Sequence, residues 1–435
     1  MGWVDSTYVT SGPAQNQNPA AFPLSVDASG RFLKNSAGVP FFMHADTPWM
    51  LPNNLNDTQV DTYVSWLSSA GFNTCLVEAP GFFYSDNSPT TNNVDGNAPF
   101  TTMSPNFNWT LNNSYWTRVD RLVNSCKTLG IFVWIAPAYA GFNGGSQGCY
   151  TEILAASAGA LQSYGAALAN RYTQGNVGWL MGGDYALAGS GGRAQQWNVV
   201  TGIRSVRTTD LISAHPARSE DAYALWGPAG DNLTGFNVNC VYTAGTDGFS
   251  LSATAYGRSP AMPAVMFEAG YENETTIALF RLSSYQVLLS GCCGHHIGNK
   301  PRWDFGSAAF GGGGAANALS TALNTTGTTQ MGYLKALFTT YAWQKLVPKT
   351  DASLVSSALG TGAGRVCPAL SSDNTFALIW SPAVNVTIVM TNFTQGTVRI
   401  RLFDPTTGTY SAVGSFANTG SQTVTVAAES VVVCD

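Results

Sequence analysis

Short apolar runs alternate with longer amphipathic stretches from Pro40 to about Lys345. Most of the short runs are continuously apolar, which is typical of parallel strands that are buried on both faces. We predict eight strands, at residues 41–45, 74–78, 131–136, 177–181, 211–214, 236–241, 264–267 and 294–297. Eight strands that alternate with helices predict an α/β fold of the (β/α)8 TIM barrel type, with a doubly wound open sheet as the alternative.

The segments between these runs carry apolar residues at helical spacing. In the first, Asp57 and Thr58 precede apolar residues three and four positions apart, and Gly71 closes the pattern. We predict further helices within residues 115–129, 151–172, 280–289 and 331–346.

The pattern changes after Pro348, where β-branched or alternating runs are separated by Asn, Gly and Pro turns. Strands are expected at residues 376–380, 384–390, 398–403, 422–426 and 430–433. The chain therefore divides into an N-terminal extension (1–22), a catalytic barrel (23–348) and a small antiparallel β-sandwich (349–435). The Gly-rich segment 306–314 is predicted to be a mobile loop at the mouth of the barrel.

Composition and charge narrow the class of protein. A chain of 435 residues exceeds what one compact core usually holds, in agreement with two domains. Charged residues make up only 10%, the net charge is −5, and Lys and Arg form no run, so neither nucleic acid nor an anionic membrane is an expected partner. No apolar stretch approaches the roughly 18 residues of a membrane span. We expect a monomer.

Two features favour a secreted glycoprotein. The Asn-x-Ser/Thr pattern occurs at Asn56, Asn108, Asn112, Asn232, Asn273, Asn324, Asn385 and Asn392. The eight cysteines form no CxxC pair, and with four His a zinc site is not expected. An even number of cysteines favours disulfides, for example between Cys367 and Cys434, although buried free thiols are the alternative.

Two acids stand directly after predicted barrel strands. Asp184 follows the fourth strand through Gly182-Gly183, and Glu268 follows the seventh. Chemistry in such barrels sits at the carboxyl ends of the strands, and strands four and seven face each other, so these two side chains can flank one glycosidic bond. The alternatives are an Asp that caps a helix and a Glu in a salt bridge, and Glu272 and Glu274 compete for the second role.

Further polar and aromatic residues end the same strands and are candidates for binding sugar. Asp46 and Glu78 could accept hydrogen bonds from hydroxyls, although Asp46 could equally form an Asx turn. His215 and His296 are candidates for holding a hydroxyl group. The aromatic candidates, whose flat rings suit the apolar face of a sugar although most aromatics only pack, are Trp49, Tyr139, Tyr185, Tyr242, Tyr271 and Trp303.

Several of these segments, taken in order, resemble a known family. They include Asp46-Thr47-Pro48-Trp49, Gly182-Gly183-Asp184, Glu268-Ala269-Gly270-Tyr271-Glu272 and His295-His296-Ile297-Gly298-Asn299. Together they resemble the apiosidase-like barrel of glycoside hydrolase family 140, once called domain of unknown function 4038. The tail, with Phe403-Asp404-Pro405-Thr406-Thr407-Gly408, is similar to the collagen-binding-like β-domain attached to that barrel.

The resemblance implies a retaining glycoside hydrolase in which Asp184 is the acid/base and Glu268 the nucleophile, with no cofactor. It also implies removal of a terminal apiose or other glycosyl residue from a plant polysaccharide or glycoside. The chain departs from the family at Ala45, where Gly is common. Two other functions stay open: an endo-acting hydrolase of a plant or fungal wall polysaccharide, and a non-catalytic carbohydrate- or matrix-binding protein.

Overall fold

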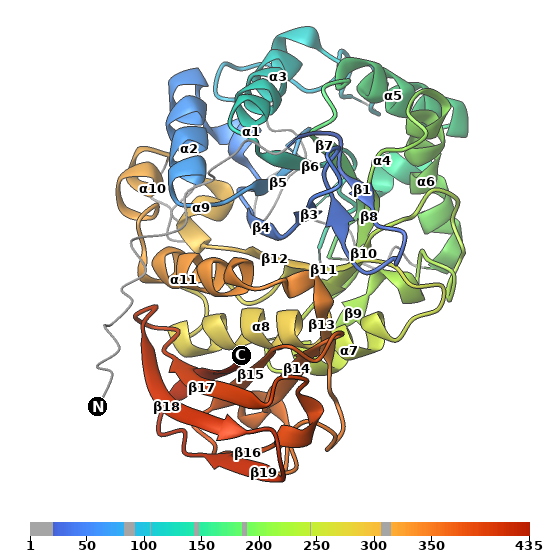
Figure 1. The fold of residues 1–435 in the computed structure, drawn as a ribbon. Coiled ribbons are helices and arrows are strands. Elements are labelled where there is room, and N and C mark those ends of the chain that lie inside the picture. The colour runs from blue at the N-terminus through green and yellow to red at the C-terminus, as the bar shows by residue number, and fades with distance from the viewer. Residues whose placement is uncertain are drawn as a thin grey trace.

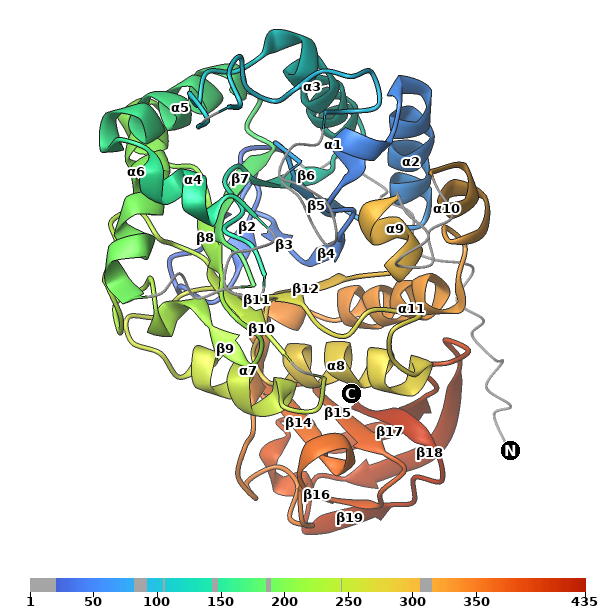
Figure 2. The same ribbon diagram turned by 180° about the vertical axis from the view of Figure 1, so that it is seen from behind.

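The computed structural model describes residues 21–81, 92–104, 106–142, 148–184, 189–243, 245–305 and 315–435. Eight parallel strands curl into a barrel (Figures 1 and 2). In chain order they are β4 (Met43–Asp46), β5 (Thr74–Glu78), β6 (Phe132–Ala136), β7 (Val177–Gly182), β8 (Ile212–His215), β10 (Asn239–Tyr242), β11 (Ala264–Glu268) and β12 (Gly294–Ile297).

The order of the strands around the sheet confirms the predicted barrel. Each of the eight strands pairs with the next one in the chain except β8 with β10, and β12 pairs with β4, so the last strand lies beside the first. Between β8 and β10, the backbone amides of Asn237 and Val238 both donate to the Ile212 carbonyl at 3.1 Å. The short β9 (Glu220–Asp221) adds antiparallel to β10. A doubly wound open sheet has no such closure.

The barrel interior is filled by large side chains that face one another. The rings of Trp134 on β6 and Phe267 on β11 lie 5.0 Å apart, and Phe267 lies 4.5 Å from His296 on β12. Gly178 on β7 makes room for Trp134, because a Cβ there would lie 2.7 Å from the indole ring. Such filling is expected of an eight-stranded barrel, which is a packed core and not a pore.

Helices surround the barrel (Figure 1). They are α1 (Leu51–Asn54), α2 (Asp57–Ser69), α3 (Asn113–Thr128), α4 (Tyr150–Ala155), α5 (Ala158–Arg171), α6 (Gly189–Val206), α7 (Gly248–Tyr256), α8 (Ile277–Leu289), α9 (Lys300–Asp304), α10 (Ala315–Thr321) and α11 (Thr326–Thr340). The helix expected over 151–172 is two helices, because Ala156 is extended and the Ser157 side chain accepts the Ala160 amide as a new N-cap.

Three further sheets lie outside the barrel. The short strands β1 (Ser25–Val26), β2 (Leu33–Lys34) and β3 (Pro40–Phe41) lie at one end of it (Figure 1). The C-terminal region is the expected antiparallel sandwich. Its larger sheet has the order β13 (Leu346–Pro348), β14 (Cys367–Ser371), β15 (Ala377–Pro382), β20 (Glu429–Cys434), β17 (Thr397–Phe403), β18 (Tyr410–Ala417), and its smaller sheet pairs β16 (Val386–Val389) with β19 (Ser421–Val424).

The disulfide prediction is wrong for this structure. All eight cysteines lie within the described residues, and all are buried and free, so Cys367 and Cys434 do not form the expected cross-link. Cys367 lies on β14 and Cys434 on β20, with β15 between the two strands, and each buried thiol packs as a small apolar group. The buried-thiol alternative describes them correctly.

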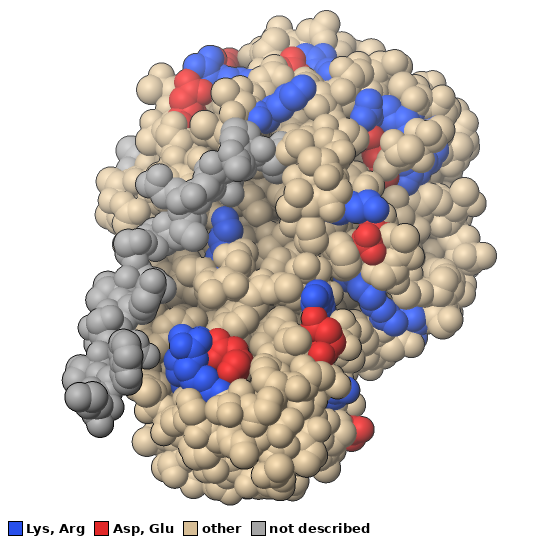
Figure 3. Space-filling model, in the orientation of Figure 1, with Lys and Arg blue, Asp and Glu red and all other residues tan. Residues whose placement is uncertain are grey.

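The surface matches the low charge of the sequence. Lys, Arg, Asp and Glu are few and scattered on the face shown in Figure 3. Among the described helices, none is both long and apolar enough to cross a membrane. The Gly-rich segment 306–314 lies outside the described residues.

Candidate active site

The strand ends bring the two predicted acids together. Asp184 stands two residues beyond β7, and Glu268 is the last residue of β11. One carboxylate oxygen of each lies within 4.8 Å of the other. Gly182 gives the turn before Asp184 its shape, with a φ of 82°, and a Cβ there would lie 2.2 Å from the His215 carbonyl oxygen.

His215, the last residue of β8, lies between the two carboxylates. Its Nδ1 is 3.2 Å from Asp184 Oδ1, and its Nε2 is 3.1 Å from Glu268 Oε2. Burial lowers the pKa of His215, but the hydrogen bond to Glu268 and the charges of both carboxylates outweigh it, so that its pKa is raised overall. The imidazole therefore lies between the two acids, and its Nδ1 is also 3.1 Å from the Pro216 carbonyl oxygen.

The surroundings of Asp184 favour its protonated form. Burial raises the pKa of Asp184 to about 7, and the nearby charge of Glu268 acts in the same direction. His215, Tyr242 and Arg218 oppose this shift. A carboxylic acid that keeps its proton near neutral pH is suited to act as a general acid.

Two tyrosines contact the carboxylates. The Tyr242 hydroxyl donates to Asp184 Oδ2 at 3.3 Å and accepts from Arg218 at 3.2 Å. Burial, and then the charge of Glu268, raises the pKa of Tyr271, whose hydroxyl also accepts from Trp49 Nε1 at 2.9 Å. These contacts fix the directions in which the carboxylate oxygens point.

The carboxylates open into a pocket with an aromatic wall. It is lined by Trp49, Met50, Glu78, Tyr139, Asp184, Glu268 and Trp303. Four of the predicted sugar-binding residues (Trp49, Glu78, Tyr139 and Trp303) are thus placed beside both acids. The predicted contact Tyr185 lies outside the described residues.

Asp46 has a different role from the one expected. Arg302 donates to both of its oxygens, at 2.8 and 3.0 Å, and the Tyr63 hydroxyl donates to Oδ2 at 2.6 Å. With its carboxylate occupied by these partners and fully buried, Asp46 anchors α9 and does not face a sugar. His296 also packs inside the barrel, where Nε2 lies 3.3 Å from Met43 Sδ.

Glu272 and Glu274, the other two acids in the loop after β11, are bonded to partners outside the pocket. Glu272 accepts from the Gly327 amide at 2.7 Å and from Thr325 Oγ1 at 2.6 Å, so it joins this loop to the start of α11. Glu274 accepts from the Tyr271 amide at 3.0 Å and pairs with Lys300 at 3.3 Å. Neither lines the pocket.

Sequence reasoning missed two arginines. Arg218 contacts Tyr242, and its position three residues after His215, in the loop that follows β8, was a usable signal. Arg302 holds Asp46 from 256 positions away, and no spacing rule could have paired the two.

The same three side chains could in principle hold a cation. Asp184, His215 and Glu268 each offer one ligand atom, and these atoms lie within 4.8 Å of one another. The catalytic carboxylate pair of a glycoside hydrolase, with an imidazole between the two acids, would consist of the same three groups. The two interpretations differ in their response to a chelator, which gives a direct test.

Comparison with known proteins places this geometry in context. A family model described as "Apiosidase-like, catalytic domain" matches residues 27–345, and one described as "Putative collagen-binding domain of a collagenase" matches residues 347–431. Comparison with curated proteins finds no match.

Solved structures share the architecture. One, described as a glycoside hydrolase family 5 from Bacteroides vulgatus ATCC 8482, has a TM-score of 0.79 at 21% identity, over 95% of this chain and 93% of that one. Another, described as "Glycoside hydrolase", has a TM-score of 0.79 at 19% identity, over 95% of this chain and 96% of that one. At such identities the likeness establishes the fold.

Proposed function

Since this chain belongs to the apiosidase-like family of catalytic domains and is a glycoside hydrolase, we propose that it is an extracellular, retaining, exo-acting enzyme. Its substrate is a plant polysaccharide or glycoside from which it removes a terminal apiose-like or other glycosyl residue. The observation that carries the proposal is the approach of the Asp184 and Glu268 oxygens to within 4.8 Å, at the carboxyl ends of opposite strands.

The short separation favours retention over inversion. Retaining glycosidases hold their carboxyl groups roughly 5–5.5 Å apart, whereas inverting enzymes need roughly 6.5–9.5 Å to admit a water molecule between carboxylate and sugar. In the first step Asp184 donates its proton to the leaving oxygen while Glu268 attacks the anomeric carbon. The glycosidic bond breaks, and a glycosyl–Glu268 ester forms.

The second step reverses the roles. Asp184, now ionised, takes a proton from water, whose oxygen attacks the anomeric carbon and displaces Glu268 as a carboxylate. His215 is a positioning residue in both steps, because it touches both acids. The pocket walls at Trp49, Tyr139 and Trp303 can pack on the apolar face of the sugar ring.

Substitution of the two acids tests the proposal. Glu268→Gln and Asp184→Asn should each reduce kcat on a panel of aryl glycosides by about a thousandfold or more. Glu274→Gln, an acid in the same loop whose carboxylate is outside the pocket, is the matched control and should stay within about tenfold of the parent. Full turnover by either acid variant would contradict the assignment.

The stereochemical course and the mode of action have separate readouts. Proton NMR of the first-formed product should show the anomeric configuration of the substrate. A product of inverted configuration would contradict the retaining mechanism. Digestion of plant polysaccharides should release single sugars. A ladder of oligomers would instead favour the endo-acting alternative.

The proposed chemistry runs through carboxylates alone, so activity should survive dialysis against EDTA. Activity that is lost on chelation and restored by a divalent cation would favour the metal-holding interpretation of Asp184, His215 and Glu268.

Secretion is part of the proposal and rests on the glycosylation pattern. Six of the eight Asn-x-Ser/Thr asparagines, at positions 56, 108, 232, 273, 324 and 385, are exposed, as an oligosaccharide acceptor must be. Expression in a eukaryotic secretory host should give a glycoprotein whose mass falls on enzymatic deglycosylation.

A further inference from the structure

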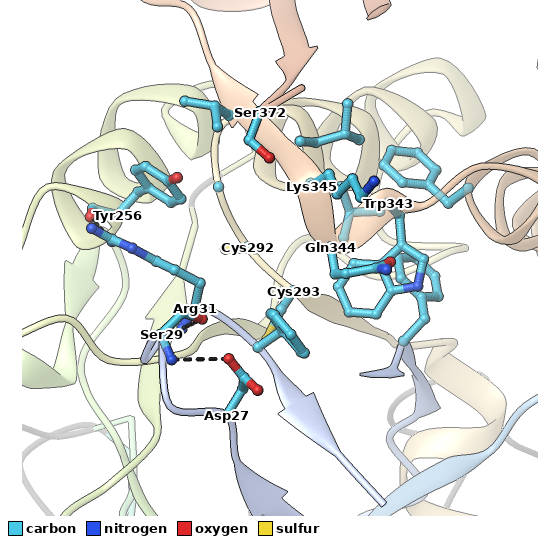
Figure 4. Close-up of a pocket in the computed structure, with 17 residues that line it drawn as sticks. Asp27, Ser29, Arg31, Tyr256, Cys292, Cys293, Trp343, Gln344, Lys345 and Ser372 are labelled. Atoms are coloured by element: carbon cyan, nitrogen blue, oxygen red, sulfur yellow. Dashed lines mark hydrogen bonds between the residues drawn. The ribbon is translucent and has the colours of Figure 1, made fainter. Parts of the chain in front are cut away.

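A second pocket, of about 370 Å³, lies at the other end of the barrel (Figure 4). Cys292 and Cys293, which line it, directly precede β12 and so mark the amino ends of the barrel strands, whereas Asp184 and Glu268 follow the carboxyl ends. Strands of this length separate the two ends by roughly 15 Å. The pocket is therefore distinct from the active site, and its volume is typical of small-molecule sites.

Three separate parts of the chain form most of its walls. These are the turn between β1 and β2, the segment before β12, and the 3-10 helix η4 (Trp343–Lys345) with β13. The walls are braced: Trp343 packs edge-on against Phe42 at 5.2 Å and Phe32 at 6.1 Å. On the other side the Arg31 guanidinium lies 4.1 Å over the Tyr256 ring. The cavity is thus preformed.

The polar groups around the cavity are varied and mostly neutral. In the described residues the side chains of Gln344 and Ser372 have no hydrogen-bond partner, and both line the cavity. Asp27 adds a carboxylate, 22% exposed, whose Oδ1 accepts from the Ser29 amide at 2.9 Å and whose Oδ2 lies 3.5 Å from Lys34 Nζ. That amide also lowers the pKa of Asp27, so the group is ionised at neutral pH.

The cations of the pocket are already engaged. Lys345 pairs with Asp373 at 2.6 Å, and Arg31 lies against Tyr256. An anionic ligand would find no unpaired cation among these walls and would face Asp27. An amide, a hydroxyl and a carboxylate beside indole and phenol rings are instead the groups that bind a neutral molecule with several hydroxyls and an apolar face.

We propose that this pocket is a second, non-catalytic carbohydrate site that holds one or two neutral sugar units of a polysaccharide. This proposal rests on the proposed function only for the class of polymer that the pocket would bind. A polysaccharide that is bound at the amino end of the barrel has its own chain ends at a raised local concentration around the active site of the same protein molecule. Binding at this pocket should therefore increase the turnover of polymers and leave the turnover of small substrates unchanged.

Affinity electrophoresis tests the site, with pectin, arabinan, xylan and mannan each cast into a native gel. The parent is the full chain carrying Glu268→Gln, so that hydrolysis does not remove the ligand. At least one polymer should retard it. Gln344→Ala should weaken the apparent affinity about fivefold through the lost hydrogen bonds. Ser372→Trp, at an exposed position, should abolish retardation by filling the mouth of the pocket.

Gln422→Ala is the matched control, since Gln422 is also half-buried but lies on β19, away from the pocket. It should migrate like the parent, and unchanged melting temperatures should show that all variants are folded. Retardation by none of the four polymers, or equal retardation of parent and pocket variants, would overturn the inference. In a chain that keeps Glu268, Gln344→Ala should hydrolyse an aryl glycoside at the same rate as the unsubstituted protein. This assay does not depend on the second pocket, so it distinguishes failure of the second-site proposal from failure of the catalytic proposal.

Discussion

Asp184 shows how a single residue takes its chemistry from its surroundings. It differs from an ordinary surface Asp in being only 9% exposed and in lying near a second carboxylate. Both conditions disfavour the ionised form, and burial is the larger of the two. The glycines before it put the residue in this position, because Gly182 adopts a conformation that strains any larger residue.

The raised pKa predicts the alkaline limb of the pH profile. Asp184 must carry a proton to act as the acid, and its pKa is raised to about 7, so the protonated fraction falls as the pH rises through that value. We therefore expect kcat for a substrate with a poor leaving group to decline above about pH 7. A profile measured between pH 4 and 9 checks this, and full activity at pH 9 would contradict it.

Tyr242→Phe is the matched variant for this profile. The hydrogen bond from Tyr242 lowers the pKa of Asp184, so its removal should move the alkaline limb to higher pH. A purely structural role for Tyr242 would reduce activity equally at every pH and leave the limb in place.

The free thiols give a second prediction at this scale. Burial raises the pKa of Cys292 to about 12 and also raises that of Cys240, so neither should react as a thiolate in the native protein. We expect almost no reaction with Ellman's reagent in buffer and eight thiols per chain in guanidinium chloride. Fewer than eight thiols in denaturant would show that disulfides form after all.

Sequence reasoning placed some site residues well and others not at all, for a physical reason. Asp184 and Glu268 stand next to apolar strands, so their place at the carboxyl ends followed from local pattern alone. Asp46 has the same local signal, but its partner Arg302 arrives from the eighth βα unit. Such a long-range ion pair depends on the closed barrel and leaves no trace in the spacing.

At the scale of elements, the same distinction separates strands that were predicted from strands that were missed. The barrel strands are buried on both faces and read as apolar runs. β18 was missed because it is a largely exposed edge strand with small and polar residues and a bulge near Gly414. β14 was missed because it contains Pro368, a residue that argues against a strand.

The Asp46–Arg302 pair predicts how strongly α9 depends on one ion pair. Asp46→Asn keeps the shape of the side chain but leaves the fully buried Arg302 guanidinium without its counter-charge. The free energy of unfolding should fall by roughly 3–5 kcal/mol. Because α9 also carries Trp303, which lines the active-site pocket, KM should rise as well. Urea unfolding and steady-state kinetics measure the two effects.

Asp120→Asn is the control for this element, since it breaks an ion pair with Arg171 that is partly exposed. The expected loss is at most about 1 kcal/mol, because water screens the pair and solvates the remaining charge. Equal losses in the two variants would show that burial does not give the Asp46 pair its strength.

At the scale of the whole molecule, α8 joins the barrel to the C-terminal sandwich. Every residue from Phe280 to Leu289 is buried, so this part of the helix is enclosed on all sides instead of along a single stripe. One side covers the barrel, and on the other Tyr285 stacks on Trp380 of β15 at 4.7 Å. Arg281 adds an ion pair to Glu429 at 2.6 Å. Residues on one face of the larger sandwich sheet, such as Leu378 and Val431, join the apolar cluster of the barrel. The other face packs against the smaller sheet in a cluster of its own.

Because one face of the sandwich shares the apolar cluster of the barrel, we predict that barrel and sandwich unfold together. Calorimetry should give a single transition, since separation of the two parts would expose α8 and the buried face of β15. Trp380→Ala should lower stability by roughly 3–5 kcal/mol, because it leaves a large cavity between the two parts. Val413→Ala, on the exposed strand β18, is the matched control and should change stability by at most about 0.5 kcal/mol. If the parent already melts in two steps, or if Trp380→Ala melts like Val413→Ala, the sandwich is an independent attachment and α8 does not couple it to the catalytic barrel.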